Sequence, residues 1–371
     1  MKKMNKKLAL AILTLGFAGL MPSAASAESC YADNCAPKSC DPCNTTSDCC
    51  SFDVGVDFLY WKPCVDDLDY AAKVHGITSD IDNPLHVDYK SVCPEWEPGF
   101  RITLGKAQAW KSFDLSFSYT WLNSDDSQST HAGNGERIAA VGLHPYLVTG
   151  NEATNSFYDI AKGKWELNYQ TFDILLSHSF KCGSCHTISP FFGVEIVKLD
   201  QKWKTGYEYQ NEQGPFEVAG SKWKSDYKGA GLKLGTDYSY ALCEGLSLFA
   251  RASGTIAIGD ATTTNQQVAY EFTITEGQPI LGDEHYIDFK DDDCCHVVPG
   301  YHLQLGLQYE DDTCGCEYKL RLGYEMVNWY NLQNPRRWFE NTEEGNIAQS
   351  TQSNTTTLGF HGLLAGIEVK F

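Results

Sequence analysis

Beyond its first 27 residues, the sequence has no apolar run that approaches the ~20 residues needed by a membrane-spanning helix. Basic residues are also scarce, since 29 Lys and Arg stand against 48 Asp and Glu, a formal net charge of −19. A phosphate backbone attracts basic surfaces, so this charge argues against nucleic acid as a partner. With 42% hydrophobic and 21% charged residues, disorder is excluded as the main description of the chain.

Catalytic and metal-binding motifs are likewise missing. There is no G-x-S-x-G nucleophile elbow, and no histidine is paired with a nucleophile in a way that the sequence reveals, although an Asp/His pair at a loop rim is left open. Cys182-Gly183-Ser184-Cys185-His186 matches the haem-attachment pattern, but a short turn leaves no room for a haem pocket. Cys294-Cys295-His296 and Cys314-Gly315-Cys316 lack the spacing of a structural zinc site, and Asp291-Asp292-Asp293 lacks the spaced ligands of a calcium loop. We therefore predict no enzyme, no catalytic residues, no cofactor and no metal.

The first 27 residues have the features of a secretory signal peptide. Four lysines precede the apolar run 8–20, and Ala25-Ser26-Ala27 fits the small-residue cleavage pattern, with a membrane anchor as the alternative. All 15 cysteines follow this segment, which indicates an oxidising compartment and disulfides. Six of them lie in 28–50, which we interpret as a cysteine-rich periplasmic segment.

From residue 51 onward, apolar and polar residues alternate. Because successive side chains of a strand point to opposite faces, each alternating segment predicts a strand with one apolar and one polar face. A change of phase near Thr171 suggests a β-bulge. Ten segments show the pattern: 52–60, 100–104, 113–121, 172–176, 192–196, 230–234, 246–252, 301–309, 318–324 and 363–371.

The connections between these segments alternate in length. The long ones are 63–98, 123–164, 205–221, 259–296 and 331–355. Long external loops and short periplasmic turns are typical of a transmembrane barrel. We therefore predict an all-β fold for 51–371: a closed antiparallel transmembrane β-barrel of 10–12 strands. The number of strands is ten, or twelve if 259–296 contains a further hairpin.

Three further features agree with a barrel in a bacterial outer membrane. Tryptophans gather near the loop-side strand ends, which predicts an outer aromatic girdle. The five long connections hold 28 acidic and 8 basic residues, a net charge of −20. The chain ends at Phe371 on an alternating strand, the form of signal that the outer-membrane assembly machinery recognises.

The polar face of the strands carries charged residues of both signs. Placing Arg or Lys toward lipid costs about 2–4 kcal/mol at the midplane, so these residues are expected to face the interior. There they either line a water-filled pore or pair with one another in a plugged lumen. The predicted pore-lining residues are Asp53, Asp57, Arg101, Asp114, Glu195, Lys233, Asp237, Arg251, Lys319, Arg321 and Glu325.

The cysteines outside 28–50 are candidates for disulfides. Cys64 follows the first predicted strand and Cys93 precedes the second, so a bridge between them would fix the first long loop. An odd number of cysteines leaves at least one thiol free or bound to another molecule. The remaining candidates are Cys182, Cys185, Cys294, Cys295, Cys314 and Cys316.

Phe58-Leu59-Tyr60-Trp61-Lys62-Pro63, followed by Asp67-Leu68-Asp69-Tyr70-Ala71, resembles the first-strand signature of Legionella-type pore-forming outer-membrane proteins. That family includes the major-outer-membrane-protein-like (MOMP-like) porins of environmental chlamydiae. The resemblance implies an outer-membrane β-barrel with pore-forming activity and assigns no catalytic residues. The cysteine-rich segment departs from the pattern and would suit chlamydial envelopes, where disulfides cross-link outer-membrane proteins.

Two functions are therefore expected. The first is a porin for ions and small hydrophilic solutes, weakly preferring cations because acidic loops ring its entrance. The alternative is a structural or adhesive surface barrel, disulfide-linked into the outer-membrane complex. Expected partners are outer-membrane lipids, the assembly machinery, and disulfide-linked envelope proteins or further copies of the chain.

Overall fold

A computed structural model of the chain describes residues 52–75, 86–110, 112–144, 147, 157–183, 185–211, 214–275, 278–313, 316–335 and 354–371. The predicted signal peptide 1–27 and cysteine-rich segment 28–50 lie outside these residues. Within them, no helix is long and apolar enough to cross a membrane.

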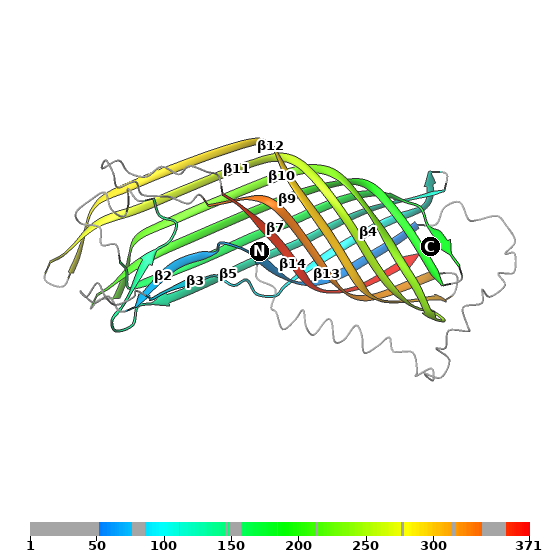
Figure 1. Cartoon of the computed structure of the whole chain (residues 1–371), viewed down its shortest axis with the longest axis horizontal. Helices are drawn as coiled ribbons and strands as arrows, with labels where there is room; N and C mark the ends of the chain where they lie inside the picture. Colours follow the sequence, from blue (N-terminus) through cyan, green and yellow to red (C-terminus); the bar gives the residue numbers. More distant parts are fainter. Residues whose placement is uncertain are drawn as a thin grey trace.

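Ten long antiparallel strands form a ring (Figure 1). Each strand pairs with its sequence neighbour among the ten, and β14 pairs with β1, so the order returns to its start. The strands are β1 (Phe52–Val65), β4 (Glu97–Trp110), β5 (Phe113–His131), β7 (Ile160–Ser177), β9 (His186–Asn211), β10 (Gly214–Cys243), β11 (Leu246–Thr275), β12 (Gln278–Thr313), β13 (Cys316–Asn334) and β14 (Asn354–Lys370).

All ten predicted segments fall within these ten strands, in the predicted order. The alternative of twelve is wrong, because β11 and β12 remain paired as one hairpin through Val268, which lies opposite Tyr286. The bulge predicted near Thr171 is also wrong, since Thr171 lies in unbroken register between Thr120 and Val197.

The strands are much longer than the alternation predicted. The stretches 205–221 and 259–296, predicted as loops, are mostly continuations of β9, β10, β11 and β12, and β12 reaches 36 residues. In Figure 1, β11 and β12 project farthest at one end, while the chain ends at the other. We call the end that holds Phe371 the turn end, because the short connections 111–112 and 244–245 lie there, and the opposite end the loop end.

A band of apolar side chains surrounds the outside of the ring nearer the turn end. These side chains are well exposed, up to 71% for Leu232. A protein surrounded by water rarely exposes so large an apolar area, so this band is a contact surface. We call it the apolar belt; its residues include Val54, Val56, Ile102, Leu104, Phe117, Phe172, Ile174, Phe192, Val194, Ile196, Leu232, Leu234, Ile256, Ile258, Leu303, Leu305, Leu307, Leu322, Tyr324, Leu363 and Ile367.

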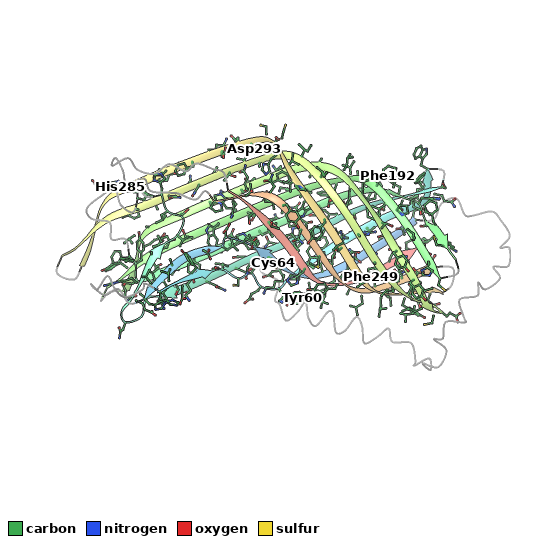
Figure 2. All side chains as sticks on the ribbon, viewed as in Figure 1. Tyr60, Cys64, Phe192, Phe249, His285 and Asp293 are labelled. Carbon is green, nitrogen blue, oxygen red and sulfur yellow. The ribbon has the colours of Figure 1, made fainter. Side chains whose placement is uncertain are left out.

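Beyond the belt, toward the loop end, the burial pattern reverses. We call this part the extension: residues 160–171 of β7, 197–211 of β9, 214–229 of β10, 259–275 of β11 and 278–298 of β12. Here the outward positions are largely charged or polar and the inward positions are mainly apolar, such as Trp165, Trp203 and Trp223. Figure 2 shows the two regions along one hairpin, with His285 far out in the extension and Phe249 nearer the turn end.

A small second sheet packs on the extension. β2 (Asp69–His75) pairs with β3 (His86–Ser91) and β6 (Glu136–Ala140), which come from the connections after β1 and β5. A short strand, β8 (Phe180–Cys182), pairs with β9 at the turn end. Gly163 of β7 makes the docking of the small sheet possible, because a Cβ there would lie 2.8 Å from the ring of Tyr70.

Candidate functional site: the interior of the ring

The interior at the turn end is a polar cavity with a volume of about 430 Å³. Charged side chains on the inward positions of the strands line it, and serine hydroxyls fill the positions between them. Its charged residues are Asp53, Asp57, Arg101, Asp114, Asp237, Arg251, Glu310, Lys319, Arg321 and Glu368.

Above the cavity, Arg101 of β4 stands at the centre of an ion-pair network. It donates to Glu325 of β13 at 2.6 Å and to the hydroxyl of Thr120 at 3.0 Å. Its other nitrogen lies 3.7 Å from Asp57, which in turn accepts a 2.9 Å hydrogen bond from Arg321. Each buried charge therefore has an opposite partner, as burial in a low-dielectric interior requires.

Glu325 is 1% exposed, and side chains from three strands surround it. Besides Arg101, Gln304 donates to it at 2.7 Å and His302 contacts the same oxygen. Its carboxylate thus links β4, β12 and β13 across the inside of the ring.

A second buried network lies on the opposite strands. Lys233 of β10 donates to Asp173 at 3.0 Å and to Glu195 at 3.2 Å, and Thr255 donates to Glu195 at 2.5 Å. One lysine therefore neutralises carboxylates of two neighbouring strands, β7 and β9. A void of about 20 Å³ separates this group from the Arg101 network, which is room for about one water molecule.

The guanidinium of Arg251 is held by a bidentate pair with Asp237, at 2.5 and 2.7 Å. It also lies 5.2 Å from the centre of the Phe191 ring. Planar two-point pairing fixes the orientation of both side chains, so Arg251 is a positioned charge on the cavity wall.

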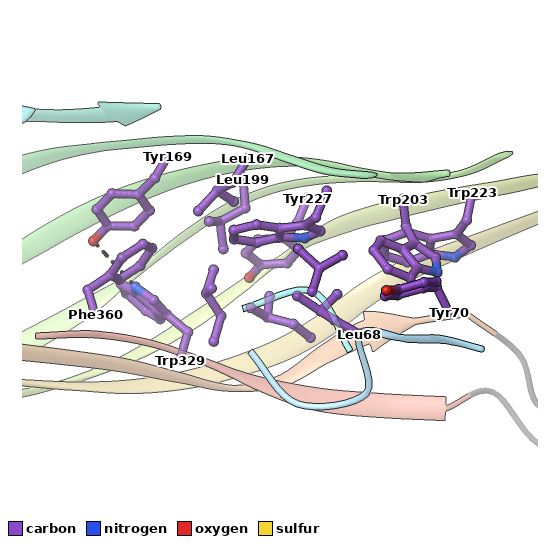
Figure 3. Close-up of a cluster of buried hydrophobic side chains, with 14 of the residues drawn as sticks. Leu68, Tyr70, Leu167, Tyr169, Leu199, Trp203, Trp223, Tyr227, Trp329 and Phe360 are labelled. Atoms are coloured by element: carbon purple, nitrogen blue, oxygen red, sulfur yellow. Dashed lines mark hydrogen bonds between the residues drawn. The ribbon is translucent and has the colours of Figure 1, made fainter. Parts of the chain in front are cut away.

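A layer of aromatic rings lies next to the ion pairs, and Figure 3 shows three of its members, Tyr169, Trp329 and Phe360. Trp61, Tyr169, Trp329 and Phe360 form this aromatic layer, with Phe360 centred 4.7 Å from Tyr169 and 5.5 Å from Trp61. The indole of Trp329 donates to the hydroxyl of Tyr169 at 3.3 Å. Arg101 lies 5.9 Å from the Trp61 ring, so the ion pairs and the aromatic layer are in contact.

The extension and the small sheet add further apolar material above this layer. Figure 3 shows Leu68 and Tyr70 lying beneath Trp203 and Trp223. Tyr207 fastens the connecting segments, because its hydroxyl donates to the carbonyl of Tyr70 at 2.8 Å and accepts from the backbone N–H of Val141 at 3.0 Å. Burial raises the pKa of the neighbouring Tyr158 to about 12. Among the described residues, a continuous cluster of buried apolar side chains runs from the aromatic layer into the extension and the small sheet.

All eleven charged residues named from the sequence lie on the inward face. Eight line the polar cavity, and Glu195, Lys233 and Glu325 lie in the ion-pair networks above it. Sequence reasoning missed Asp173 and His302, although each is a polar residue between two outward apolar neighbours. Whether any of these residues lines a conduction path stays a prediction.

The predicted tryptophan girdle is largely wrong. Trp61, Trp165, Trp203, Trp223 and Trp329 are all at most 5% exposed and point inward. The other two tryptophans on which the prediction rests, Trp96 and Trp121, are partly exposed, and Trp96 stacks on Tyr60 with ring centres 5.5 Å apart. Tryptophan rings suit both a membrane interface and a large apolar core, so their place in the sequence alone does not decide between the two.

The cysteine predictions stay open. Cys64, Cys93, Cys182, Cys294 and Cys295 carry free thiols, and Cys185 is disulfide-bonded, so the turn holds no Cys182–Cys185 bridge. Cys314 lies outside the described residues and the side chain of Cys316 is not described. Within the described part of the chain, no group of His, Cys, Asp and Glu has the geometry to hold a metal ion.

An antiparallel ring with an apolar exterior and an interior of ion pairs defines the class of outer-membrane proteins built from strands. Residues 42–371 match the family described as the Legionella pneumophila major outer membrane protein precursor, so the chain belongs to that family. The protein resides in the outer membrane, and the family resemblance inferred from the first strand is confirmed.

Comparison with solved structures finds distant likenesses of the fold. The outer-membrane protease OmpT from Escherichia coli is 8% identical, with a TM-score of 0.41, covering 89% of this chain and 99% of its own. The CymD monoaromatic hydrocarbon channel is 8% identical with a TM-score of 0.30, covering 86% and 88%. The toluene transporter TodX of P. putida is 8% identical with a TM-score of 0.24, covering 88% and 90%. No curated protein matches the chain.

Proposed function

We propose that the ring is a closed transmembrane β-barrel and that it serves as a channel for ions and small hydrophilic solutes. The apolar belt faces lipid, because the outward side chains of the strands are apolar at the heights where the inward ones are charged. In this proposal the long hairpins of the extension stand on the outer side and the short turns in the periplasm. The observation that carries the proposal is the polar cavity inside the belt, lined by charges of both signs.

The proposed path runs from the periplasmic cavity past Arg101 to the aromatic layer, which acts as the gate. The charged groups along this path are neutralised by their ion-pair partners. A passing ion is therefore not strongly attracted or repelled by an unpaired charge. The aromatic layer is apolar and buried, and in this proposal its rings move to let water or a solute pass.

Weak cation preference is part of this proposal. Besides the eleven predicted residues, three carboxylates lie in the described interior, Asp173, Glu310 and Glu368, and no further lysine or arginine lies with them. The five stretches predicted as long loops, two of which are mostly strand in the extension, contribute their net charge of −20 on the proposed outer side. Exposed charges act over a screening length of about 8 Å at physiological ionic strength, so the preference should fade as salt rises.

A structural or adhesive barrel is the second candidate, and the filled interior favours it. An eight-stranded barrel is just filled by side chains and a sixteen-stranded barrel holds an aqueous channel, so ten strands stand near the filled limit. In that case the ion pairs and aromatic rings serve only to hold the wall together. Neither of the two candidate functions includes catalysis.

Planar-bilayer conductance of the refolded mature chain separates the two candidates. For a channel, the wild type conducts in discrete steps, Trp329→Ala increases the open time or the step size, and Trp110→Ala, an exposed tryptophan at the turn end, changes neither. Reversal potentials across a potassium chloride gradient then test the cation preference at low and high salt. A wild type that stays silent, whether or not Trp329→Ala conducts, would favour the structural barrel.

A further inference from the structure

The outer surface of the extension carries a dense group of lysines on an otherwise acidic protein. Eight of the 29 Lys and Arg residues of the chain lie there, on three adjacent strands β7, β9 and β10. One of them, Lys162, pairs with Glu208. We call the other seven the lysine patch: Lys164, Lys198, Lys202, Lys204, Lys222, Lys224 and Lys228.

The register places these lysines directly against one another. Lys202 lies opposite Lys224, Lys204 opposite Lys222, and Lys198 opposite Lys228. Lys204 also lies opposite Lys164 on its other side. Like charges directly opposite each other destabilise a sheet. These four pairs of lysines therefore lower the stability of the sheet unless an anion lies between them.

The acids of the chain offset this loss of stability only in part. Lys164 pairs with Asp125 at 3.2 Å and with Glu166 at 2.7 Å, whereas Lys202 and Lys204 have only Glu166, at 3.5 and 3.9 Å, within ion-pair distance in the described part of the chain. Asp200 pairs with Lys198 at 3.1 Å. Asp226 lies opposite Asp200, which repels it.

The other side of the patch has no ion pair within 4 Å: Lys222, Lys224 and Lys228 form none in the described part of the chain. Lys228 lies opposite Asp260 of β11, and Asp226 lies between Lys224 and Lys228 on the same face. The upper lysines of this strand, Lys222 and Lys224, have no carboxylate directly opposite them and point into the medium around the barrel.

The height of the patch identifies the medium. Lys198 follows Ile196 of the belt by two residues and Lys204 by eight. At about 3.3 Å per residue and a strand tilt of about 40°, the patch runs from about 5 Å to about 20 Å beyond the belt. A phospholipid headgroup region is only about 5–7 Å thick on each side, so it reaches the lowest lysines and not the upper rows.

We propose that the lysine patch binds a phosphorylated glycolipid of the outer leaflet, whose phosphates are carried on a sugar headgroup tall enough to span the rows of lysines. The acyl chains of this lipid lie on the belt residues Ile196, Leu232 and Ile256 directly below. Its phosphates lie between the opposed lysines and replace their mutual repulsion by attraction. This site is on the outer wall, so it is independent of whether the interior conducts.

The test is binding of rough-type lipopolysaccharide, which carries phosphates on its sugars, to the detergent-solubilised mature chain. Neutralising the upper rows in Lys202→Gln/Lys204→Gln/Lys222→Gln/Lys224→Gln should weaken the affinity at least about tenfold. A matched control neutralises four outward lysines elsewhere and should stay within about twofold of the wild type. The control positions are Lys62, Lys106, Lys181 and Lys290.

Thermal unfolding gives a second readout that does not depend on measuring the bound lipid. Without lipopolysaccharide, the quadruple variant should unfold at the same or a higher temperature than the wild type, because the like-charge contacts are gone. With lipopolysaccharide, the unfolding temperature of the wild type should rise and that of the variant should change little. Lys222→Gln/Lys224→Gln, which removes only lysines without ion pairs, serves if the quadruple variant does not fold.

Several outcomes would overturn the proposal. Equal binding by the wild type and the quadruple variant would show that the lysines are not the site. If dephosphorylated lipopolysaccharide binds as tightly as the phosphorylated form, the phosphates are not what the patch recognises. If phosphatidylglycerol binds as tightly as lipopolysaccharide, a tall sugar headgroup is not needed. Full competition by millimolar inorganic phosphate would point to a site for free anions.

Discussion

The belt and the extension are made by the same strands, yet their burial patterns are opposite. On β9, Ile196 is 45% exposed, whereas the next residue, Val197, is fully buried. Below that point the outward residues are apolar and the inward ones charged; above it, lysines face outward and Leu199, Trp203 and Tyr207 face inward. The change occurs without a register shift in β7, β9 or β10 at this height.

This reversal follows from the medium outside the wall. The pleat fixes which side chains point out and which point in, and it does not change along a regular strand. Lipid outside favours apolar outward residues, and water outside favours charged ones, so the sequence must exchange the two sets where the membrane ends. The inward residues are the opposite set at each height. They form ion pairs at the height of the belt and an aromatic core in the extension.

Removing a core side chain from the extension should have the largest effect on stability. Trp165 is fully buried, and Trp165→Ala should lower the free energy of unfolding by about 3–5 kcal/mol. Chemical unfolding in lipid vesicles measures the change, with the 58%-exposed Trp110→Ala as the matched control. A loss of similar size at both tryptophans would mean that the extension has no core of its own.

This division also explains how much of the fold could be predicted. The ten belt segments were predicted because each keeps one phase of alternation, as in Phe192, Val194 and Ile196. The extension was predicted as loop because the phase inverts after Ile196, so the alternation of Lys202 and Lys204 with Trp203 was not recognised as strand. The same inversion near Thr171 was interpreted as a bulge.

The candidate site was predicted in part for a similar reason. The cost of placing a charge in lipid was enough to direct residues such as Arg101 and Lys233 inward. Their partners depend on register across the closed ring: Asp57 lies opposite Arg101, yet it also reaches Arg321 two strands away past Gly366. A Cβ at Gly366 would lie 1.9 Å from the Asp57 carboxylate, so this contact needs a glycine that alternation does not mark.

Placing a charge on the belt should have the next largest effect. Leu232→Arg puts a guanidinium on the most exposed belt position and should cost about 2–4 kcal/mol if it lies near the midplane. Lys228→Arg, four residues along the same face in the extension, should change stability by less than about 0.5 kcal/mol. If the two substitutions change the free energy of unfolding in vesicles by the same amount, the boundary between lipid and water does not lie between Lys228 and Leu232.

A smaller effect is expected in the small sheet. Glu136 accepts a hydrogen bond from the backbone N–H of Gly133 and pairs with Lys73 at 2.6 Å, and these contacts, the one from Lys73 first, lower its pKa. Its contribution is present above the pKa of an unfolded glutamate and is lost as pH falls through the lower, folded value. The hydrogen-exchange protection of β2 and β6, relative to the intrinsic exchange rate at each pH, should therefore fall on acidification in the wild type and fall less in Glu136→Gln. Identical pH profiles would show that the ion pair does not hold β6.

The smallest effect tests the charges on the outside of the extension. The hydrogen bond from Lys164, the largest cause, and the other two lysines lower the pKa of Glu166, which is 27% exposed. Its charge therefore stabilises the fold above the pKa of an unfolded glutamate, and this contribution is lost as pH falls through the folded value. At neutral pH in detergent without lipopolysaccharide, Glu166→Gln should lose no more than about 1 kcal/mol, because exposed ion pairs are screened by solvent. At a pH where the carboxyl is protonated in both states, the variant and the wild type should unfold alike.

Glu317→Gln, at an exposed pair with Lys370 near the turn end, is the control and should lose less, because a single lysine depends on that carboxylate. A loss at Glu166 that persists at low pH would assign it to packing, and the lysines of the extension would then need no counter-ion.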